Sequence, residues 1–206
     1  MASGDTDVTI CSQALLLLGQ SEISSFTDGT QISGACGSLY PDIKAQLLSM
    51  YNWSFCTKKE QLAQLSSTPV NEWTREYQLP SDIITGSPQA VYNSASTGIA
   101  PIATGWEILG DKLQTDEATI VIDYIFNVNE SLMPQYFVQL LKYAVAAHLA
   151  EAVTDQITKA EYWHQKSFGP PTDNMRGGYF RQACHIDGRG RIPQSLPVFP
   201  LTDVRV

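Results

Sequence analysis

The sequence lacks the short motifs that mark the commonest nucleotide, dinucleotide and zinc-protease sites. Neither GxxxxGKS/T nor GxGxxG occurs, so nothing supports a packaging motor or a dinucleotide enzyme. HExxH is also absent, and the three histidines, His148, His164 and His185, have no converging partners at ligand spacing. The sequence therefore predicts neither a metal site nor a cofactor.

Paired cysteine motifs are missing as well. The four cysteines, Cys11, Cys36, Cys56 and Cys184, form no CxxC pair, so they lack the spacing of zinc and redox sites. Cys11 and Cys36 fall on the apolar stripes of two predicted helices, where a thiol behaves as a small hydrophobe. We interpret them as reduced core residues.

No apolar run approaches the roughly 20 residues that cross a bilayer. The first five residues are acidic, where a signal peptide would be basic. We therefore expect a protein that is made and used without passing through a membrane.

Charge is sparse, at 17% of residues, and unevenly placed along a chain of net charge −8. Residues 176–206 carry a charge of +3, which leaves −11 on residues 1–175. The arginines of this basic tail are Arg176, Arg181, Arg189, Arg191 and Arg205. We expect them to dock on an acidic surface of a neighbouring copy or of another protein, the alternative being a solvated tail. The acidic body would repel phosphate, which argues against nucleic-acid binding through a positive field.

Helical periodicity appears in the first and last thirds of the chain. The first helix is expected at 7–18, capped by Thr6 or Asp5 and stopped by Gly19. A second apolar stripe runs from residue 32 to 51, with Pro41 predicting a kink or a new start. A third covers 137–152, where His148 is expected as a hydrogen-bonded interior residue. The fourth follows a cap at Thr154 or Asp155 and ends near 168.

Between these helices the pattern changes to that of strands. Residues 119–126 are β-branched and aromatic and predict a buried strand. Residues 86–92 and 105–109 are shorter candidates, followed by a hairpin turn at 110–113. The period of 58–65 fits either a helix or an extended strand.

Taken together, these patterns predict an α+β protein. A four-helix bundle comprises residues 6–66 and 129–168, and a small antiparallel β module is inserted at 67–128. Residues 169–206, interrupted by glycine and proline, are expected to form an extended C-terminal arm.

Four segments, in this order and spacing, resemble the tail tubular protein A family, the head-to-tail adaptors of short-tailed bacteriophages. They are ICSQALLLLG at 10–19, LLSMYNWSFCTKKEQLAQL at 47–65, EYQLPSDII at 76–84 and YFVQLLKYAVAAHLAEAVT at 136–154. The likeness covers roughly residues 7–165. After Phe168 the chain departs from the longer helix that is usual in the family.

The resemblance implies a structural virion protein of the tail, assembled in the host cytoplasm. Such a protein forms a ring, expected to have twelve copies, between the portal protein and a tail nozzle of the tail tubular protein B type. It lines the channel through which viral DNA passes without sequence-specific binding. Tail fibres are a further candidate partner, and neither catalysis nor a cofactor is implied.

The family motifs contain six residues whose roles we interpret as structural: Trp53, Phe55, Tyr77, Leu79, Pro80 and Asp82. Aromatic side chains where a helix ends are usually core residues, although they also occur at exposed partner-binding patches. Proline and aspartate at 80 and 82 are what a turn requires for backbone reasons.

Two other function classes remain open. Glu72, Glu76 and Asp82, near Trp73 and Tyr77, are the residue mixture of a glycosidase cleft, which makes a tail-associated peptidoglycan hydrolase the enzyme alternative. An oligomeric interaction module unrelated to phages would use the same helices. A nucleophile built from Cys184, His185 and Asp187 is disfavoured, because no rigid scaffold is evident there.

Overall fold

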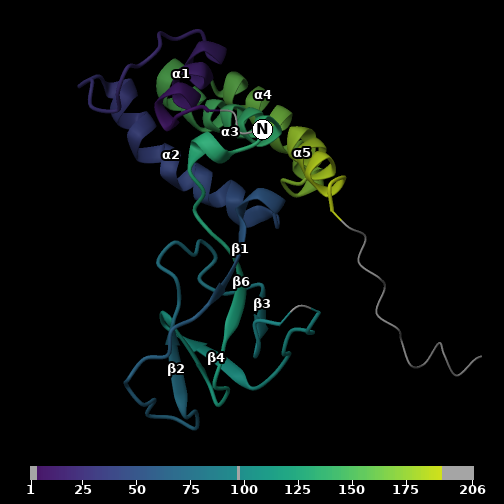
Figure 1. The fold of residues 1–206 in the computed structure, drawn as a ribbon. Helices are drawn as coiled ribbons and strands as arrows, with labels where there is room; N and C mark the ends of the chain where they lie inside the picture. The colour runs from purple at the N-terminus through teal and green to yellow at the C-terminus, as the bar shows by residue number, and fades with distance from the viewer. Residues whose placement is uncertain (1–3, 97, 192–206) are drawn as a thin grey trace, which may run out of the picture.

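The computed structural model describes residues 4–96 and 98–191, which form a helical part and a β part joined by a narrow waist (Figure 1). The predicted α+β class is confirmed. Within the described residues the helical part contains α1 (Asp7–Leu17), α2 (Gln31–Met50), α3 (Gln135–Thr154), α4 (Ile157–Phe168) and α5 (Gly178–Gly188). Short 3₁₀ turns follow α2 at Ser54–Cys56, precede α3 at Glu130–Leu132 and follow α4 at Pro171–Asp173.

The first helix begins and ends as its sequence predicts. The Thr6 hydroxyl accepts a hydrogen bond from the Thr9 backbone N–H at 3.2 Å, and the Thr9 hydroxyl accepts one from the Thr6 N–H. After the helix, Gly19 takes the left-handed conformation with φ of 77°. Cys11 on this helix is fully buried, as is Cys36 on α2, so both are core residues as predicted.

Helix α2 continues without interruption past Pro41. The proline side chain is exposed, so the carbonyl that loses its backbone donor lies on the solvated side of the helix. Of the two outcomes predicted for Pro41, a new helix start is therefore wrong.

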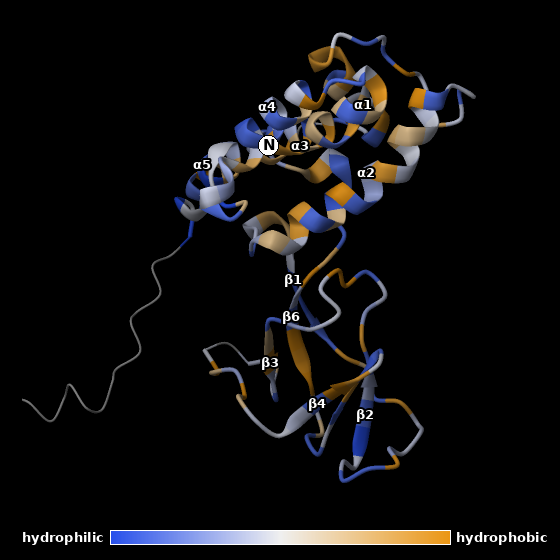
Figure 2. Ribbon diagram, turned by 180° about the vertical axis from the view of Figure 1, so that it is seen from behind, coloured by the Kyte–Doolittle hydropathy of each residue, from blue (hydrophilic) through white to orange (hydrophobic). Residues whose placement is uncertain are grey.

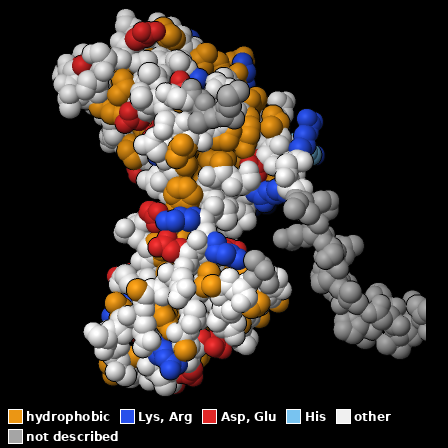
Figure 3. Space-filling model, viewed as in Figure 1, with side chains coloured by type: hydrophobic (Ala, Val, Ile, Leu, Met, Phe, Trp, Pro, Cys, Tyr) orange, Lys and Arg blue, Asp and Glu red, His pale blue; other side chains and the backbone are white. Residues whose placement is uncertain are grey.

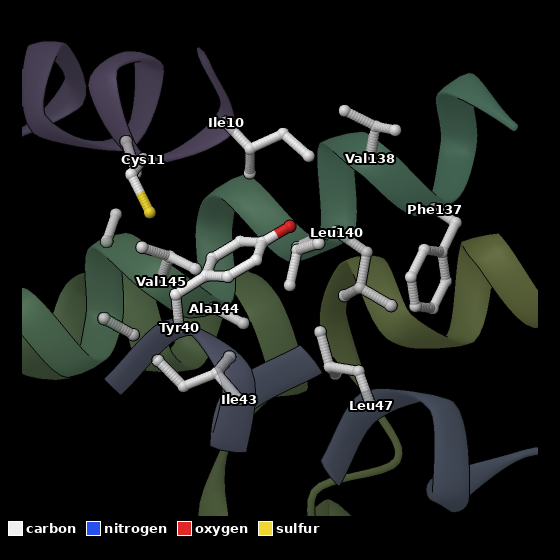
Figure 4. Close-up of a cluster of buried hydrophobic side chains, with 14 of the residues drawn as sticks. Ile10, Cys11, Tyr40, Ile43, Leu47, Phe137, Val138, Leu140, Ala144 and Val145 are labelled. Carbon is white, nitrogen blue, oxygen red and sulfur yellow. The ribbon is translucent and has the colours of Figure 1, made fainter. Parts of the chain in front are cut away.

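Helix α3 is the centre of the helical part, because it lies against α1, α2, α4 and α5. Its small buried residues let the neighbouring helices approach closely. Figure 4 shows side chains of α1 and α2 converging on it; those labelled are Ile10, Cys11, Tyr40, Ile43, Leu47, Phe137, Val138, Leu140, Ala144 and Val145.

Two predictions about the helical part are wrong. In the described residues four helices, α1, α2, α4 and α5, lie against a fifth, α3, rather than forming a four-helix bundle. The extended arm expected from residue 169 is replaced over Gly178–Gly188 by α5, because Phe180, Ala183 and Asp187 recur at helical spacing and are buried together. Residues 192–206 of the predicted arm lie outside the described residues.

The boundary between α3 and α4 also differs from the prediction. Asp155 has φ of 52° and ends α3 in the left-handed conformation, and Gln156 is the N-cap of α4. Thr154 donates its hydroxyl hydrogen to the Ala150 carbonyl, so neither predicted cap is used.

Two three-stranded antiparallel sheets make up the β part. One has the order β1-β6-β3, from Thr57–Gln61, Val121–Ile125 and Ala90–Tyr92. The other has the order β2-β5-β4, from Arg75–Gln78, Lys112–Thr115 and Trp106–Leu109. β1 pairs with β6 from Thr57 to Gln61. The segment 58–65, whose period fits either a helix or a strand, therefore begins as a strand.

The central strand β6 is buried along nearly its whole length, which confirms the predicted buried strand. Figure 2 shows it as the hydrophobic strand of the β part, whereas β2 is largely hydrophilic. The predicted hairpin is also confirmed: Leu109 pairs with Lys112, and Gly110 in the turn has φ of 65°, which glycine adopts without strain.

Charged side chains gather at the waist between the two parts (Figure 3). There the Tyr124 hydroxyl lies 2.9 Å from Glu60 Oε2 and 3.0 Å from Asp82 Oδ1. Lys58 forms an ion pair with Glu60 at 2.8 Å. Polar contacts therefore tie β1, β6 and the turn after β2 together beside the helical part.

Candidate functional site

The end of α2 is anchored by Trp53, whose side chain is fully buried. Its indole N–H donates to the Leu47 carbonyl at 2.9 Å, which satisfies the polar atom of the ring. Its ring meets those of Phe137 on α3 and Phe180 on α5 edge to face, at 5.1 and 5.9 Å between centroids. Phe55 is half-buried and packs against the rings of Trp53 and Phe137. Trp53 therefore lies in the core, and Phe55 packs at its edge.

Helix α5 is held against this anchor by Asp187, a carboxylate that is only 4% exposed. It accepts hydrogen bonds from the Ser54 backbone N–H at 3.1 Å, the Ser54 hydroxyl at 2.6 Å and the Tyr136 hydroxyl at 2.6 Å. Arg191 completes the cluster through an ion pair at 2.9 Å. A buried charge that is paired and hydrogen-bonded in this way fixes the position of its helix.

Sequence reasoning missed this role of Asp187. Asp187 was considered only as part of the disfavoured nucleophile and within the summed charge of the tail, because its partner Ser54 is 133 positions away. One local signal was present: Asp187 and Arg191 are four residues apart, a spacing that places opposite charges together on a helix.

The structure separates the predicted docking arginines into two kinds. Arg191 is used inside the chain, by Asp187 and by the ring of Tyr51, 5.3 Å from its guanidinium. Arg176, Arg181 and Arg189 are exposed, and none has an ion-pair partner among residues 4–96 and 98–191. Arg205 lies outside the described residues.

The three unpaired arginines line one groove of about 740 Å³ between the end of α2 and α5. We call it the basic groove. Its apolar lining comes from Met50, Tyr51 and Phe180, and His185 lies at its edge. Guanidinium groups around an apolar floor are suited to a peptide that carries carboxylates and an apolar side chain.

A second groove, of about 430 Å³, lies between α3 and α4. Its lining includes Glu151, Glu161, Ile157, His148 and His164, with no lysine or arginine. We call it the acidic groove. His148 is exposed here, so the prediction of an interior histidine is wrong. Partial desolvation and the neighbouring His164 lower the pKa of His148, which favours the uncharged ring at neutral pH.

The motif residues of the β part make contacts within the fold. Tyr77 is 1% exposed and donates its hydroxyl to the Glu117 carbonyl at 2.8 Å. Leu79 is buried, Pro80 is half-buried at the turn, and Asp82 accepts the bond from Tyr124 described above. The Tyr124–Asp82 bond ties strand β6 of one sheet to the turn that follows β2 of the other.

The carboxylates of the hydrolase alternative are not brought together. Glu76 is buried and bonded to Ser67, Lys112 and Gln114, and the Ser67 hydroxyl and Lys112 lower its pKa. A general acid needs the opposite shift. Asp82 binds Tyr124 of the other sheet, and Glu72 is exposed.

The disfavoured nucleophile has no geometry to support it. Asp187 faces Ser54 and Tyr136, and burial raises the pKa of the Cys184 thiol to about 11, so the thiolate is scarce at neutral pH. In the described part of the chain, no group of three or more His, Cys, Asp or Glu side chains is placed to hold a metal ion. None of the described helices has the length and apolar character needed to cross a membrane.

Comparison with known proteins identifies no family. No family model matches the chain, and no curated protein matches it. Among solved structures, the chain is similar to one described as the "Neck of empty GTA particle computed with C6 symmetry". The two are 16% identical with a TM-score of 0.29, over 79% of this chain and 94% of the other. At that TM-score the match supports no conclusion about fold or function.

Proposed function

We propose that this chain is a structural adaptor of a phage-like particle. In this role, copies of the chain form a ring, expected to have twelve members, between a portal protein and a tail nozzle. Viral DNA passes through the ring without being held. The ring is part of the virion and is assembled in the host cytoplasm.

The segments that resemble the family support the proposal because they form central elements of the fold. One of them supplies α1 and another α3, the first and the central helix of the helical part. The segment at 47–65 contains the Trp53 anchor and β1, and the segment at 76–84 contains the turn at the waist. The resemblance therefore rests on residues that fix the shape of the chain.

The observation that carries the proposal is the placement of unpaired positive charge. Arg176, Arg181 and Arg189 surround one groove at the edge of a chain whose first 175 residues carry −11. A ring subunit needs a surface that binds the neighbouring copy and a surface along which DNA slides without adhering. The basic groove suits the first requirement and the acidic body suits the second.

The test is co-sedimentation with portal particles of a short-tailed phage, using Arg176→Gln/Arg181→Gln and the matched variant Lys58→Gln/Lys59→Gln. Each variant loses two positive charges, one pair at the basic groove and the other at the waist. We expect the wild type and the waist variant to sediment with portals. The groove variant should bind at least about tenfold more weakly, because copies that no longer contact one another lose the added affinity of a ring. Absence of wild-type binding would contradict the proposal and favour an interaction module unrelated to phages.

A further inference from the structure

The acidic groove carries charge that the described chain leaves unpaired. Glu151 and Glu161 are exposed, and neither has an ion-pair partner among the described residues. The two lysines of α4 nearest to it are engaged elsewhere. Lys159 donates to the Leu18 carbonyl at 3.4 Å, and Lys166 lies over the rings of Tyr143 and Trp163 at 4.9 Å.

An exposed apolar side chain accompanies these carboxylates. Ile157, the first residue of α4, lines the acidic groove and is 62% exposed. The basic groove offers the complementary set, since its arginines surround the apolar floor of Met50, Tyr51 and Phe180. Burying an isoleucine on such a floor contributes favourably to association, while the arginines pair with the carboxylates.

Among the described residues, the carboxylates of the acidic groove form no ion pair with the arginines of the basic groove. The basic groove is beside the start of α3, where Phe180 and Phe137 both contact Trp53. The acidic groove is at Ala147, His148 and Glu151, about three to four turns, or roughly 15–20 Å, further along the axis of α3. Figure 1 shows α5, which forms one wall of the basic groove, at one edge of the helical part.

We propose that the acidic groove of one copy docks on the basic groove of the next copy, so that Glu151 and Glu161 pair with Arg176 and Arg181 while Ile157 contacts the apolar floor. Two different surfaces of the same chain then form a head-to-tail interface, which closes into a ring when the rotation between copies permits. This inference rests on the proposed ring and assigns its subunit interface.

Disulfide trapping tests the pairing directly, with Cys184→Ser as the background because Cys184 lines the basic groove. One chain carries Arg181→Cys and a second carries Glu161→Cys. After mild oxidation of the mixture with copper–phenanthroline, we expect a mixed dimer in at least about tenfold excess over a control that pairs Arg181→Cys with Glu107→Cys on β4. Yields equal to the control would overturn the proposal.

Charge reversal in the same assay distinguishes a specific contact from random collision. Adding Arg176→Glu to the first chain should reduce the mixed dimer, and adding Glu151→Arg to the second chain should restore it. The Arg176→Glu variant should unfold at the wild-type denaturant concentration, because Arg176 has no ion pair in the described chain. If the second reversal fails to restore the yield, the assigned pairing is wrong.

The outcomes separate this inference from the proposed function. Trapping that succeeds while portal binding fails would keep the interface and remove the adaptor role. Portal binding that succeeds while trapping stays at the control level would keep the adaptor role and require a different subunit interface.

Discussion

The helical part and the β part are stabilised in different ways. The helical part has an extended apolar core around α3, closed at one end by the Trp53 ring cluster. The β part has a smaller apolar core. Hydrogen bonds of partly buried side chains add to it, from Ser67 and Lys112 to Glu76 and from Tyr124 to Glu60. Apolar burial is close-packed but has no preferred direction, whereas hydrogen-bonded carboxylates fix orientation.

Replacement of Trp53 should have the largest effect. Trp53→Ala removes a fully buried ring from the point where α2, α3 and α5 meet, and we expect a loss of about 3–5 kcal/mol in the free energy of unfolding. Trp73→Ala in the β part is the matched control, since Trp73 is partly exposed and should cost less than about 1 kcal/mol. Urea denaturation measures both, and equal losses would contradict the comparison.

Removal of the Asp187 carboxylate should come next. Asp187→Ala leaves the Ser54 hydroxyl, the Tyr136 hydroxyl and Arg191 without their acceptor, and we expect a cost of about 3 kcal/mol. Amide hydrogen exchange should accelerate over Gly178–Gly188 and stay unchanged in β6. Asp42→Ala, an exposed change on α2, is the control. Unchanged protection of α5 would show that Asp187 does not hold the helix.

A smaller loss is expected at the waist. Tyr124→Phe keeps the buried ring and removes the hydroxyl that contacts Glu60 and Asp82, at a cost of about 1–2 kcal/mol. Tyr162→Phe on the exposed surface of α4 should be neutral. If both variants unfold at the wild-type urea concentration, the polar contacts at the waist contribute nothing to stability.

The smallest effect is a pH dependence located in the β part. Because the pKa of Glu76 is lowered in the folded state, its contribution is fully present above the carboxyl pKa of the unfolded chain and is lost as pH falls through the folded-state pKa. The stability difference between wild type and Glu76→Gln should therefore be larger at pH 7 than at pH 3. Glu72→Gln, at an exposed residue, is the control. A difference that does not change with pH would contradict this account of Glu76.

The difference between apolar burial and polar contacts also explains which elements the sequence could predict. The apolar residues of helices α1 and α3 and of strand β6 recur at the period of the element that they form. A buried element needs apolar side chains at that period, so the pattern in the sequence predicts the element. Helix α5 has only a short buried apolar stripe, Phe180 and Ala183, and its docking also depends on the contact of Asp187 with Ser54, far away in the sequence. Such a contact leaves no periodic signal.

The candidate site shows the same limit. The sequence identified all five arginines of the tail, but not that Arg191 would pair within the chain while Arg176, Arg181 and Arg189 line one groove. That division depends on how α5 packs against the end of α2. The acidic groove went unnoticed because Glu151 and Glu161 belong to different helices and meet only in the folded chain.

Cryo-electron microscopy of the protein bound to portal particles of a short-tailed phage tests the central claim most directly. The account predicts an added ring below the portal in which α5 of each copy faces α3 and α4 of the next. A portal without an added layer, or a ring whose subunits meet through their β parts alone, would contradict it.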